Sequence, residues 1–276
     1  MQSAHAPEPG YPNGTYADIP GACLYYIDTG GGGVPVVFLH AATGSSQSWE
    51  HQIPAFTAAG YRLICFDRRG RGRTEIVPAT GPQPGSGADD LLALMDVLRT
   101  DRFHLVGTAA GAFTALDFAV SWPGRLQSLV VANSIYGVQD REHLALTERL
   151  RPQPLFNQLP HDFRELGPSY RAAHPEGTQR WSALERCGRP PEPLPPQVTR
   201  KRLTFALLEA ITLPVLLITG DADLYAPPPV QRALADRLPH AESLVIAEAG
   251  HSAYWEQPAT FNRAVLAFIQ RVDRKE

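Results

Sequence analysis

Two glycines that stand two residues on either side of Ala109 have the spacing of a very tight turn. Gly107 and Gly111 follow the apolar run Phe103–Val106 and precede a predicted helix. Small residues must flank such a turn, which lifts its central side chain above the edge of a sheet, where a nucleophile for acyl transfer would stand. Taken alone, the spacing favours an ordinary strand-to-helix turn, so its meaning depends on residues farther along the chain.

An acid and a histidine follow, each in a loop after an apolar run. Asp223 comes after Pro214–Thr219, and His251 comes after Ser243–Ala247. Active sites of open α/β sheets gather at the carboxyl ends of the strands, so these loops are expected to meet. The chain order of tight turn, acid and histidine is that of one class of nucleophilic hydrolases. Asp221 is an alternative acid, but the expected acid stands three residues after the glycine, and this spacing favours Asp223.

The elements that would position these residues alternate in type. Short apolar runs predict buried strands, and apolar residues at helical spacing predict helices. The predicted strands are Cys23–Asp28, Val34–His40, Tyr61–Asp67, Phe103–Val106, Leu126–Ala132, Pro214–Thr219 and Ser243–Ala247. The predicted helices are Trp49–Ala59, Asp89–Arg99, Ala112–Ser121, Val230–Leu238 and Pro258–Arg271. This alternation predicts an α/β fold with a mostly parallel, doubly wound sheet that helices cover on both faces.

Two segments depart from the alternation. Residues 1–14 are polar and rich in proline and glycine, which predicts a loose N-terminal arm. Residues 137–210 contain no apolar strand run and read as short helices, with a proline-dense stretch near the end. We therefore predict one core, formed by residues 15–136 and 211–276, with residues 137–210 inserted as a helical cap.

At this point the sequence resembles the α/β-hydrolase superfamily, over essentially its whole length outside the arm. The segment His40–Ala42, after the run VVFL, is similar to the family's His-Gly segment, with Ala41 in place of the glycine. The segment Asp67–Thr74 is similar to the family's D-x-x-G-x-G-x-S segment. Each motif alone is weak, but their common order along the chain makes the resemblance specific.

The resemblance implies a role for each of these positions. Position 109 would be the nucleophile, His251 its general base and later general acid, and Asp223 the group that orients His251. The backbone N–H groups of Ala42 and Ala110 would form the oxyanion hole. Alanine is acceptable in the hole because only the backbone acts there.

Alanine at position 109 has no nucleophilic atom, so covalent catalysis is impossible there as the chain is written. Three explanations are open: a serine replaced deliberately, a native relative that binds a ligand without catalysis, or an enzyme that needs no nucleophile. The third includes a cofactor-free oxygenase that uses His251 and Asp223 as its base. We favour the replaced serine, because an unselected relative has no reason to keep the acid, the histidine and both glycines.

The function that the resemblance implies is a serine-type hydrolase of a small organic carboxylic ester or lactone, working through an acyl-enzyme. The alternative is hydrolysis of a C–C bond in a diketone or ring-cleavage product, as capped relatives of this fold often perform. Trp49, Tyr225 and Trp181 are candidates to contact the substrate. The four arginines of the segment Arg68–Arg73 could bind an anion, but they favour a solvated turn.

Composition excludes several other classes. The chain has 276 residues and a formal net charge of −3, which offers no electrostatic footprint for nucleic acid or an anionic membrane. No apolar run is long enough for a membrane span, and no signal peptide is recognisable, so we expect a cytoplasmic protein. Three scattered cysteines and the spacing of the histidines predict no disulfide framework, no metal and no cofactor. The expected partner is a small molecule; the sequence gives no prediction of oligomeric state.

Overall fold

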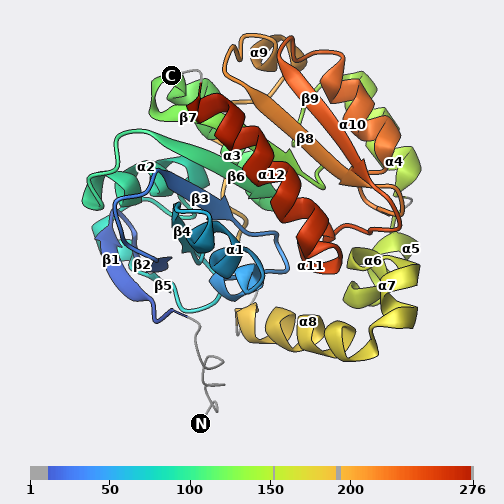
Figure 1. Cartoon of the computed structure of the whole chain (residues 1–276), viewed down its shortest axis with the longest axis horizontal. Coiled ribbons are helices and arrows are strands. Elements are labelled where there is room, and N and C mark those ends of the chain that lie inside the picture. Colours follow the sequence, from blue (N-terminus) through green and yellow to red (C-terminus); the bar gives the residue numbers. More distant parts are fainter. Residues whose placement is uncertain (1–11, 152, 191–193, 275–276) are drawn as a thin grey trace.

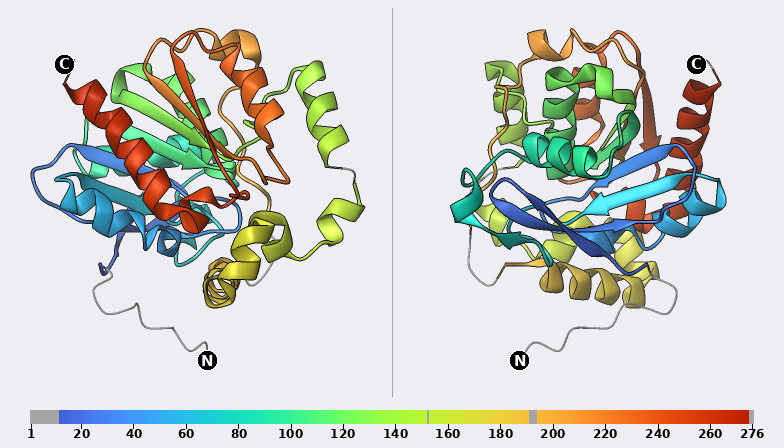
Figure 2. Two further views of the ribbon diagram at one scale, coloured as in Figure 1. Left: turned by 45° about the vertical axis from the view of Figure 1, so that its right-hand side comes forward. Right: turned by 90° about the vertical axis from the view of Figure 1, so that its left-hand side faces the viewer.

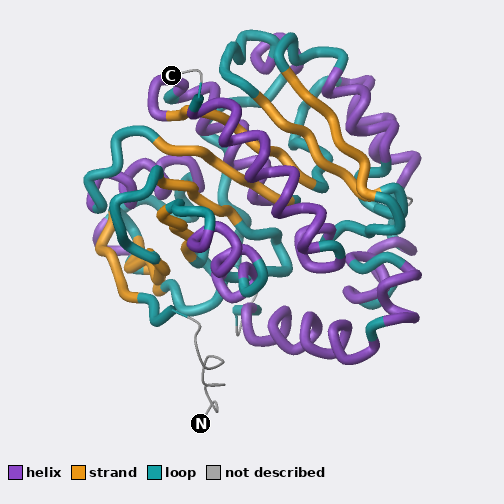
Figure 3. The backbone as a smooth tube through the Cα atoms, in the orientation of Figure 1, coloured by secondary structure: helices purple, strands orange, loops and turns teal. Residues whose placement is uncertain are grey.

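The computed structural model describes residues 12–151, 153–190 and 194–274, and its centre is a nine-stranded sheet (Figures 1 and 3). The strands are β1 Thr15–Ile19, β2 Ala22–Asp28, β3 Pro35–Leu39, β4 Arg62–Phe66, β5 Glu75–Ile76, β6 Phe103–Thr108, β7 Leu126–Ala132, β8 Val215–Gly220 and β9 Ala241–Ile246. Their order is β1-β2-β4-β3-β6-β7-β8-β9, with β5 paired to β2. Pairs that involve β1, β2 or β5 are antiparallel, and all others are parallel. The predicted mostly parallel α/β sheet is therefore confirmed.

Helices pack on both faces of the sheet, and each face has its own hydrophobic cluster. The helices of the core are α1 Gln52–Ala58, α2 Gly87–Val97, α3 Ala110–Ser121, α10 Pro228–Ala235, α11 Ala253–Glu256 and α12 Pro258–Asp273. Val37 and Leu39 of β3 join the cluster under α2, α3 and α10, whereas Val36 and Phe38 join the cluster under α1 and α12. This alternation at period two is why strands buried on both faces read as continuous apolar runs.

The sheet has a switch point between β3 and β6. From β3 the chain passes to β4 on one side, and then returns to β6 on the other side of β3. Loops diverge at such a point and leave a crevice outside the carboxyl ends of the strands, where open α/β sheets bind their ligands. The loops that begin at His40 and Ala109 leave the sheet there.

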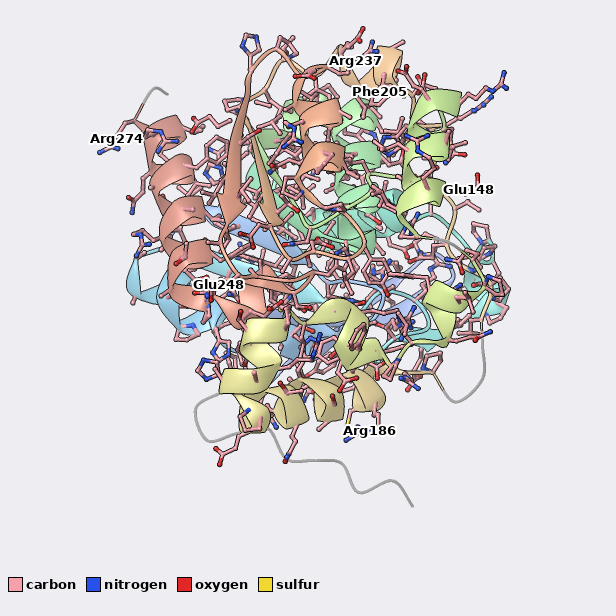
Figure 4. All side chains as sticks on the ribbon, turned by 90° about the vertical axis from the view of Figure 1, so that its right-hand side faces the viewer. Glu148, Arg186, Phe205, Arg237, Glu248 and Arg274 are labelled. Atoms are coloured by element: carbon pink, nitrogen blue, oxygen red, sulfur yellow. The ribbon has the colours of Figure 1, made fainter. Side chains whose placement is uncertain are left out.

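Residues 137–210, predicted as a cap, contain α4 Arg141–Leu150, α5 Leu155–Gln158, α6 His161–Glu165, α7 Pro168–Ala173, α8 Pro175–Gly188 and α9 Phe205–Leu208 in the described part. Helices α6–α8 lie beside the loops at the carboxyl edge (Figure 2): Ser252 N donates to Glu165 O at 2.9 Å, and Gly72 N to Gly188 O at 3.1 Å. At the other end of the segment, the Arg237 guanidinium lies 5.0 Å from the Phe205 ring centroid, which fixes α9 against the core (Figure 4).

Hydrogen bonds from Gln52 join α1 to α12 across the buried face. Its Nε2 donates to Tyr254 O at 2.8 Å and to Asn262 Oδ1 at 3.0 Å, and Asn262 Nδ2 donates to His51 O at 2.9 Å. Gln52 and Asn262 are 210 residues apart in the chain. The first and last helices of the core are thus held to each other directly.

The element predictions need two corrections. The predicted helix Trp49–Ala59 is instead a 3-10 turn, Ser46–Trp49, followed by the shorter α1, because Ser45 caps the turn separately. The strands β1 and β5 were not predicted, because the exposed residues of β1 interrupt any apolar run and β5 has only two residues. Most of the predicted arm, residues 1–11, lies outside the described residues.

Candidate active site

Ala109 lies in a backbone conformation that L-residues rarely adopt. Its φ is 49° and its ψ is −114°, between the end of β6 and the start of α3. A Cβ atom on Gly107 would lie 2.7 Å from Gly111 O, and one on Gly111 would lie 2.9 Å from His40 O. Both glycines are therefore needed for the close approach of α3 to β6 and β3, as the tight-turn pattern predicts.

His251 and Asp223 form a buried pair. His251 Nδ1 lies 2.9 Å from both Oδ1 and Oδ2 of Asp223, and the two side chains are 6% and 0% exposed. The alternative acid, Asp221, is exposed, and its Oδ1 accepts the backbone N–H of Glu248 instead. The structure therefore places Asp223, and not Asp221, against the imidazole, and leaves His251 Nε2 for another group.

Backbone and amide donors hold the Asp223 carboxylate in place. Oδ1 accepts the N–H groups of Tyr225 and Ala226 at 2.8 and 2.9 Å, and Oδ2 accepts Asn133 Nδ2 at 3.2 Å. Burial acts to raise the pKa of Asp223, but the adjacent His251 and these hydrogen bonds outweigh it, so the pKa lies below its ordinary value. Asp223 is therefore an ionised, fixed partner for the imidazole.

The environment of His251 favours its protonated form. Burial acts to lower the pKa of His251, but the Asp223 carboxylate, with a smaller contribution from Glu165, raises it above its ordinary value. The Tyr225 ring lies 4.3 Å from the imidazole, centroid to centroid, at an angle of 31°. Glu165, on α6, is buried, and its Oε2 has no partner in the described part of the chain. A group that stabilises an imidazolium lets the histidine accept a proton during a reaction.

Ala42 and Ala110 both line one cavity of about 400 Å³. Ala110 is the first residue of α3, where no carbonyl of the helix accepts the N–H. The Ala42 N–H makes no backbone hydrogen bond within the described residues. Both residues that were predicted to supply the oxyanion hole therefore border one cavity, whose lining in the described part of the chain includes neither Ala109 nor His251.

The loop that carries Ala42 is fixed by His40 and Arg68. Arg68 N donates to His40 Nε2 at 3.0 Å, so the imidazole proton is on Nδ1, which donates to Ala41 O at 2.7 Å. Arg68 Nη2 donates to the same oxygen at 3.2 Å. Burial holds the pKa of His40 well below its ordinary value, so its ring is neutral. These contacts fix Ala41, the residue that replaces the expected glycine.

The three residues that were expected to contact the substrate lie in three different environments. Trp49 is fully buried between Phe38 and Tyr254, at 5.0 and 4.9 Å from their ring centroids, and is a core residue, because the 3-10 turn directs it inward. Trp181, on α8, is 5% exposed and borders a void of about 10 Å³, room for a single water molecule. Tyr225 stacks on His251 and is the expected contact that lies within the site.

Two contributors were not predicted from the sequence. Asn133, with φ of 45°, bridges Asp223 and Gly250 O, and its place directly after β7 is a signal that could have found it. The Glu256 carboxylate accepts the N–H groups of Gly250 and Gly167, which no local pattern predicts. The turn that contains Arg68 was expected to be solvated, but the Arg68 Nε is buried and has no hydrogen-bond partner in the described part of the chain.

The described ranges contain neither a cluster of metal-binding side chains nor a membrane-spanning helix. Among these residues, no group of three or more His, Cys, Asp or Glu side chains could hold a metal ion. In the same part of the chain, no helix has the length and apolar character needed to cross a bilayer.

Comparisons with known proteins agree with this architecture. A family model described as the alpha/beta hydrolase fold matches residues 34–258. A 2-hydroxy-6-oxononadienedioate/2-hydroxy-6-oxononatrienedioate hydrolase from Burkholderia vietnamiensis is 30% identical, over 90% of this chain and 91% of the relative. A solved thermophilic esterase from Thermogutta terrifontis has a TM-score of 0.78 and 25% identity, covering 94% of this chain and 99% of its own. A solved N-acyl homoserine lactone degrading enzyme has a TM-score of 0.73 and 26% identity, covering 92% of this chain and all of its own.

The family match covers most of the chain, and these relatives match it nearly end to end. The chain therefore belongs to the α/β-hydrolase fold family.

Proposed function

We propose that this protein is a serine-type hydrolase of a small carboxylic ester or lactone, with alanine here in place of the nucleophilic serine. The observation that carries the proposal is the conformation of Ala109, whose φ of 49° and ψ of −114° are strained for a residue with a side chain. Backbone strain of this kind is typical of a functional position, where the direction of the side chain must be fixed. The names of the Thermogutta esterase and the lactone-degrading enzyme support an ester or lactone as substrate.

A serine at position 109 would react in two steps. His251 Nε2 takes the serine proton while Oγ attacks the substrate carbonyl, and the oxyanion is stabilised by the N–H groups of Ala42 and Ala110. The alcohol departs with the proton from His251 and leaves an acyl-enzyme. Water, deprotonated by the same imidazole, then attacks the acyl-enzyme and releases the acid. Asp223 keeps the imidazole oriented and stabilises its charged form throughout.

We further propose that residues 137–210 are the cap that covers this site. The contacts of Glu165 and Gly167 with the loop that carries His251 support this proposal. Phe156, on α5, packs against Tyr225 with ring centroids 4.9 Å apart. A cap in contact with the base excludes water from the reacting atoms and shapes the space for substrate.

The test is to install the missing hydroxyl. Ala109→Ser should accelerate hydrolysis of short aryl esters and simple lactones by several orders of magnitude over the unchanged chain, since loss of a triad serine costs on the order of 10⁶ in kcat. Steady-state release of the aryl alcohol measures this, and a burst equal to the enzyme concentration would report the acyl-enzyme.

The matched control is Ala109→Ser combined with Asp223→Asn. It keeps the nucleophile but removes the orienting carboxylate, and should lose on the order of 10⁴ in kcat relative to Ala109→Ser. A serine variant no faster than the unchanged chain on any ester or lactone would refute the proposal. Equal activity in the unchanged chain would instead favour chemistry that needs no nucleophile.

Hydrolysis of a C–C bond is the second candidate, because the Burkholderia relative is named as a hydrolase of a 2-hydroxy-6-oxo dienedioate. A molecule of that kind has a vinylogous diketone in place of an ester. Preference of the Ala109→Ser variant for such a diketone over the aryl esters, measured as kcat/KM, would select this candidate.

A further inference from the structure

Buried carboxylates in the described part of the chain are held by hydrogen bonds, with one exception. Both oxygens accept hydrogen bonds in Asp67, Asp90, Asp117, Glu185, Asp223 and Glu256. The exception is Glu165 on α6, which is 4% exposed and whose Oε2 has no hydrogen-bond partner in this part of the chain. An acceptor that is buried without a donor is costly, so Glu165 requires an explanation.

The internal residues outside the described ranges have no side chain that could supply the missing donor. They are Pro152, Pro191, Glu192 and Pro193. A proline has neither an N–H group nor a side-chain donor, and an ionised glutamate side chain only accepts hydrogen bonds. The donor for Glu165 is therefore expected to come from outside the protein.

Glu165 lies against the loop that carries His251. Its carbonyl oxygen accepts Ser252 N at 2.9 Å, and a Cβ atom on Gly250 would lie 3.0 Å from the same oxygen. Both chain neighbours of His251 therefore pack against the backbone of Glu165. This contact fixes α6 beside the proposed general base.

The Glu165 carboxylate also acts on the groups that form the site. Burial raises the pKa of Glu165, and the charges that influence it most are those of His251 and Asp223, in that order. Burial raises the pKa of Tyr225 as well, and Glu165 is the charge that adds most to this rise. The carboxylate is therefore within electrostatic reach of the imidazole and of the ring that stacks on it.

The part of an ester that would meet this side of the site is its alcohol. In the proposed reaction His251 Nε2 gives its proton to the departing oxygen, so this oxygen and the carbon atoms attached to it lie against the imidazole. Tyr225 stacks on the imidazole at 4.3 Å, and Phe156 packs on Tyr225 at 4.9 Å, centroid to centroid. A polar group on the alcohol part would therefore approach Glu165.

Two arginines decide which charge that polar group should have. The Arg164 guanidinium, next to Glu165 in the chain, lies 5.7 and 5.9 Å from the ring centroids of Phe156 and Tyr225. Burial lowers the pKa of Arg151, while the nearby Tyr225 acts to raise it, so a second cation lies close to the same ring. Both arginines would repel a positively charged substrate group, whereas a neutral hydroxyl donates a hydrogen bond without a charge.

We propose that Glu165 accepts a hydrogen bond from a hydroxyl group on the alcohol part of the substrate, so that the preferred substrate is a monoester of a diol or polyol. The proposal rests on the hydrolase function above and specifies its substrate class. A hydroxyl that enters with the ester gives Glu165 the donor that it lacks. An ester without the hydroxyl would leave the carboxylate buried and unpaired, and the site would discriminate against it.

The experiment compares 2-hydroxyethyl benzoate with propyl benzoate, in which a methyl group replaces the hydroxyl at nearly the same size. The unchanged chain has no nucleophile at position 109, so it can bind both esters without consuming them. In a ligand-observed NMR titration, the hydroxyethyl ester should bind at least about tenfold more tightly, as a hydrogen bond to a charged group predicts. The ester 2-methoxyethyl benzoate keeps the oxygen but has no donor, and should lose this advantage.

Three variants assign the effect to Glu165. Glu165→Met removes the acceptor at similar length, and should abolish the preference while leaving the affinity for propyl benzoate within about twofold. Glu165→Gln keeps an acceptor oxygen without the charge and should keep part of the preference, which also covers the case in which Glu165→Met does not fold. Asp162→Asn is the matched control, because Asp162 is on the same helix but its Oδ1 accepts Phe163 N at 2.9 Å. It should keep the full preference.

Equal affinity of the unchanged chain for the hydroxyethyl and propyl esters would overturn the proposal. So would a preference that Glu165→Met retains, which would assign the hydroxyl to another acceptor. Tighter binding of the cationic 2-(dimethylamino)ethyl benzoate than of the hydroxyethyl ester would overturn the choice of a neutral group. Turnover of the hydroxyethyl and propyl esters by Ala109→Ser with equal kcat/KM would overturn the hydroxyl site and leave the hydrolase function intact. Hydroxyl-selective binding without any turnover by Ala109→Ser would overturn the hydrolase function and leave the hydroxyl site intact.

Discussion

Ala109 combines the strained backbone of a tight turn with a side chain that has no reactive atom. Its N–H donates to Ala132 O at 2.9 Å, and its carbonyl accepts Ser134 Oγ at 2.8 Å and Ala112 N at 3.2 Å. These contacts hold the backbone in a region that glycine occupies freely and alanine does not. The strain, of order 1–3 kcal/mol for such a conformation, is therefore sustained by the surroundings and not by the side chain.

Ala109→Gly should increase the free energy of unfolding by about 1 kcal/mol, because relief of the strain exceeds the extra entropy that glycine gives the unfolded chain. Urea denaturation measures this. Ala119→Gly, at an ordinary position inside α3, is the control and should lower stability by about 1 kcal/mol. Destabilisation by both substitutions would show that Ala109 is not strained.

At the scale of elements, the site depends on how closely α3 approaches β3. The second residue of α3 is Gly111, and a Cβ atom there would meet the carbonyl groups of Leu39 and His40, both of them backbone. Backbone at the end of β3 cannot move aside without displacing the loop that carries Ala42. The position of α3 and the position of the loop that carries Ala42, a proposed oxyanion donor, are therefore coupled, because Gly111 has no Cβ atom.

Gly111→Ala should lower the free energy of unfolding by at least about 2 kcal/mol, since the added atom overpacks against fixed backbone. Gly124→Ala is the matched control: no atom lies within 4 Å of its added Cβ, and it should change stability by less than about 0.5 kcal/mol. Denaturation midpoints of the two variants check this, and equal effects would contradict the close approach.

The elements that surround the site were largely predictable, because buried parallel strands produce continuous apolar runs. The runs at 126–132 and 103–106 led directly to β7 and β6. The sequence left open whether Trp49 contacts a substrate or packs in the core, because a 3-10 turn and a helix start leave similar patterns and only packing decides which way the ring points. A solvated turn was the wrong expectation for Arg68, because the sequence does not show that its Nε is buried.

Across the whole molecule, Glu256 links the loop of His251 to the segment proposed as the cap. Its two oxygens both lie 3.0 Å from Gly250 N, and Oε2 also accepts Gly167 N at 2.7 Å. Burial raises the pKa of Glu256 to about 7, although these N–H donors act to lower it. Contacts between residues 89 positions apart leave no local signal, so this link could not be predicted from the sequence.

The raised pKa of Glu256 gives a defined dependence of stability on pH. Between about pH 4.5 and pH 7 the folded chain keeps the proton that the unfolded chain has lost, so the free energy of unfolding falls as pH rises, by roughly 3 kcal/mol in total from this group. Glu256→Gln cannot titrate and should remove that fall.

Urea denaturation at a series of pH values measures the difference between the two chains. The control is Asp221→Asn, an exposed acid in a neighbouring loop, which should leave the pH profile nearly unchanged. Parallel profiles for the unchanged chain and Glu256→Gln would contradict a raised pKa at Glu256.

The hydrogen bonds from Gln52 to Tyr254 and Asn262 also bear on the order of folding. They join residues more than 200 positions apart in the chain. The chain therefore loses the entropy of closing this long loop before the contact contributes any favourable free energy. The apolar face beneath α1, including Phe56, stays uncovered until α12 has been synthesised and docks. During synthesis, nascent chains should therefore remain sensitive to proteases and dependent on chaperones until nearly the last helix emerges.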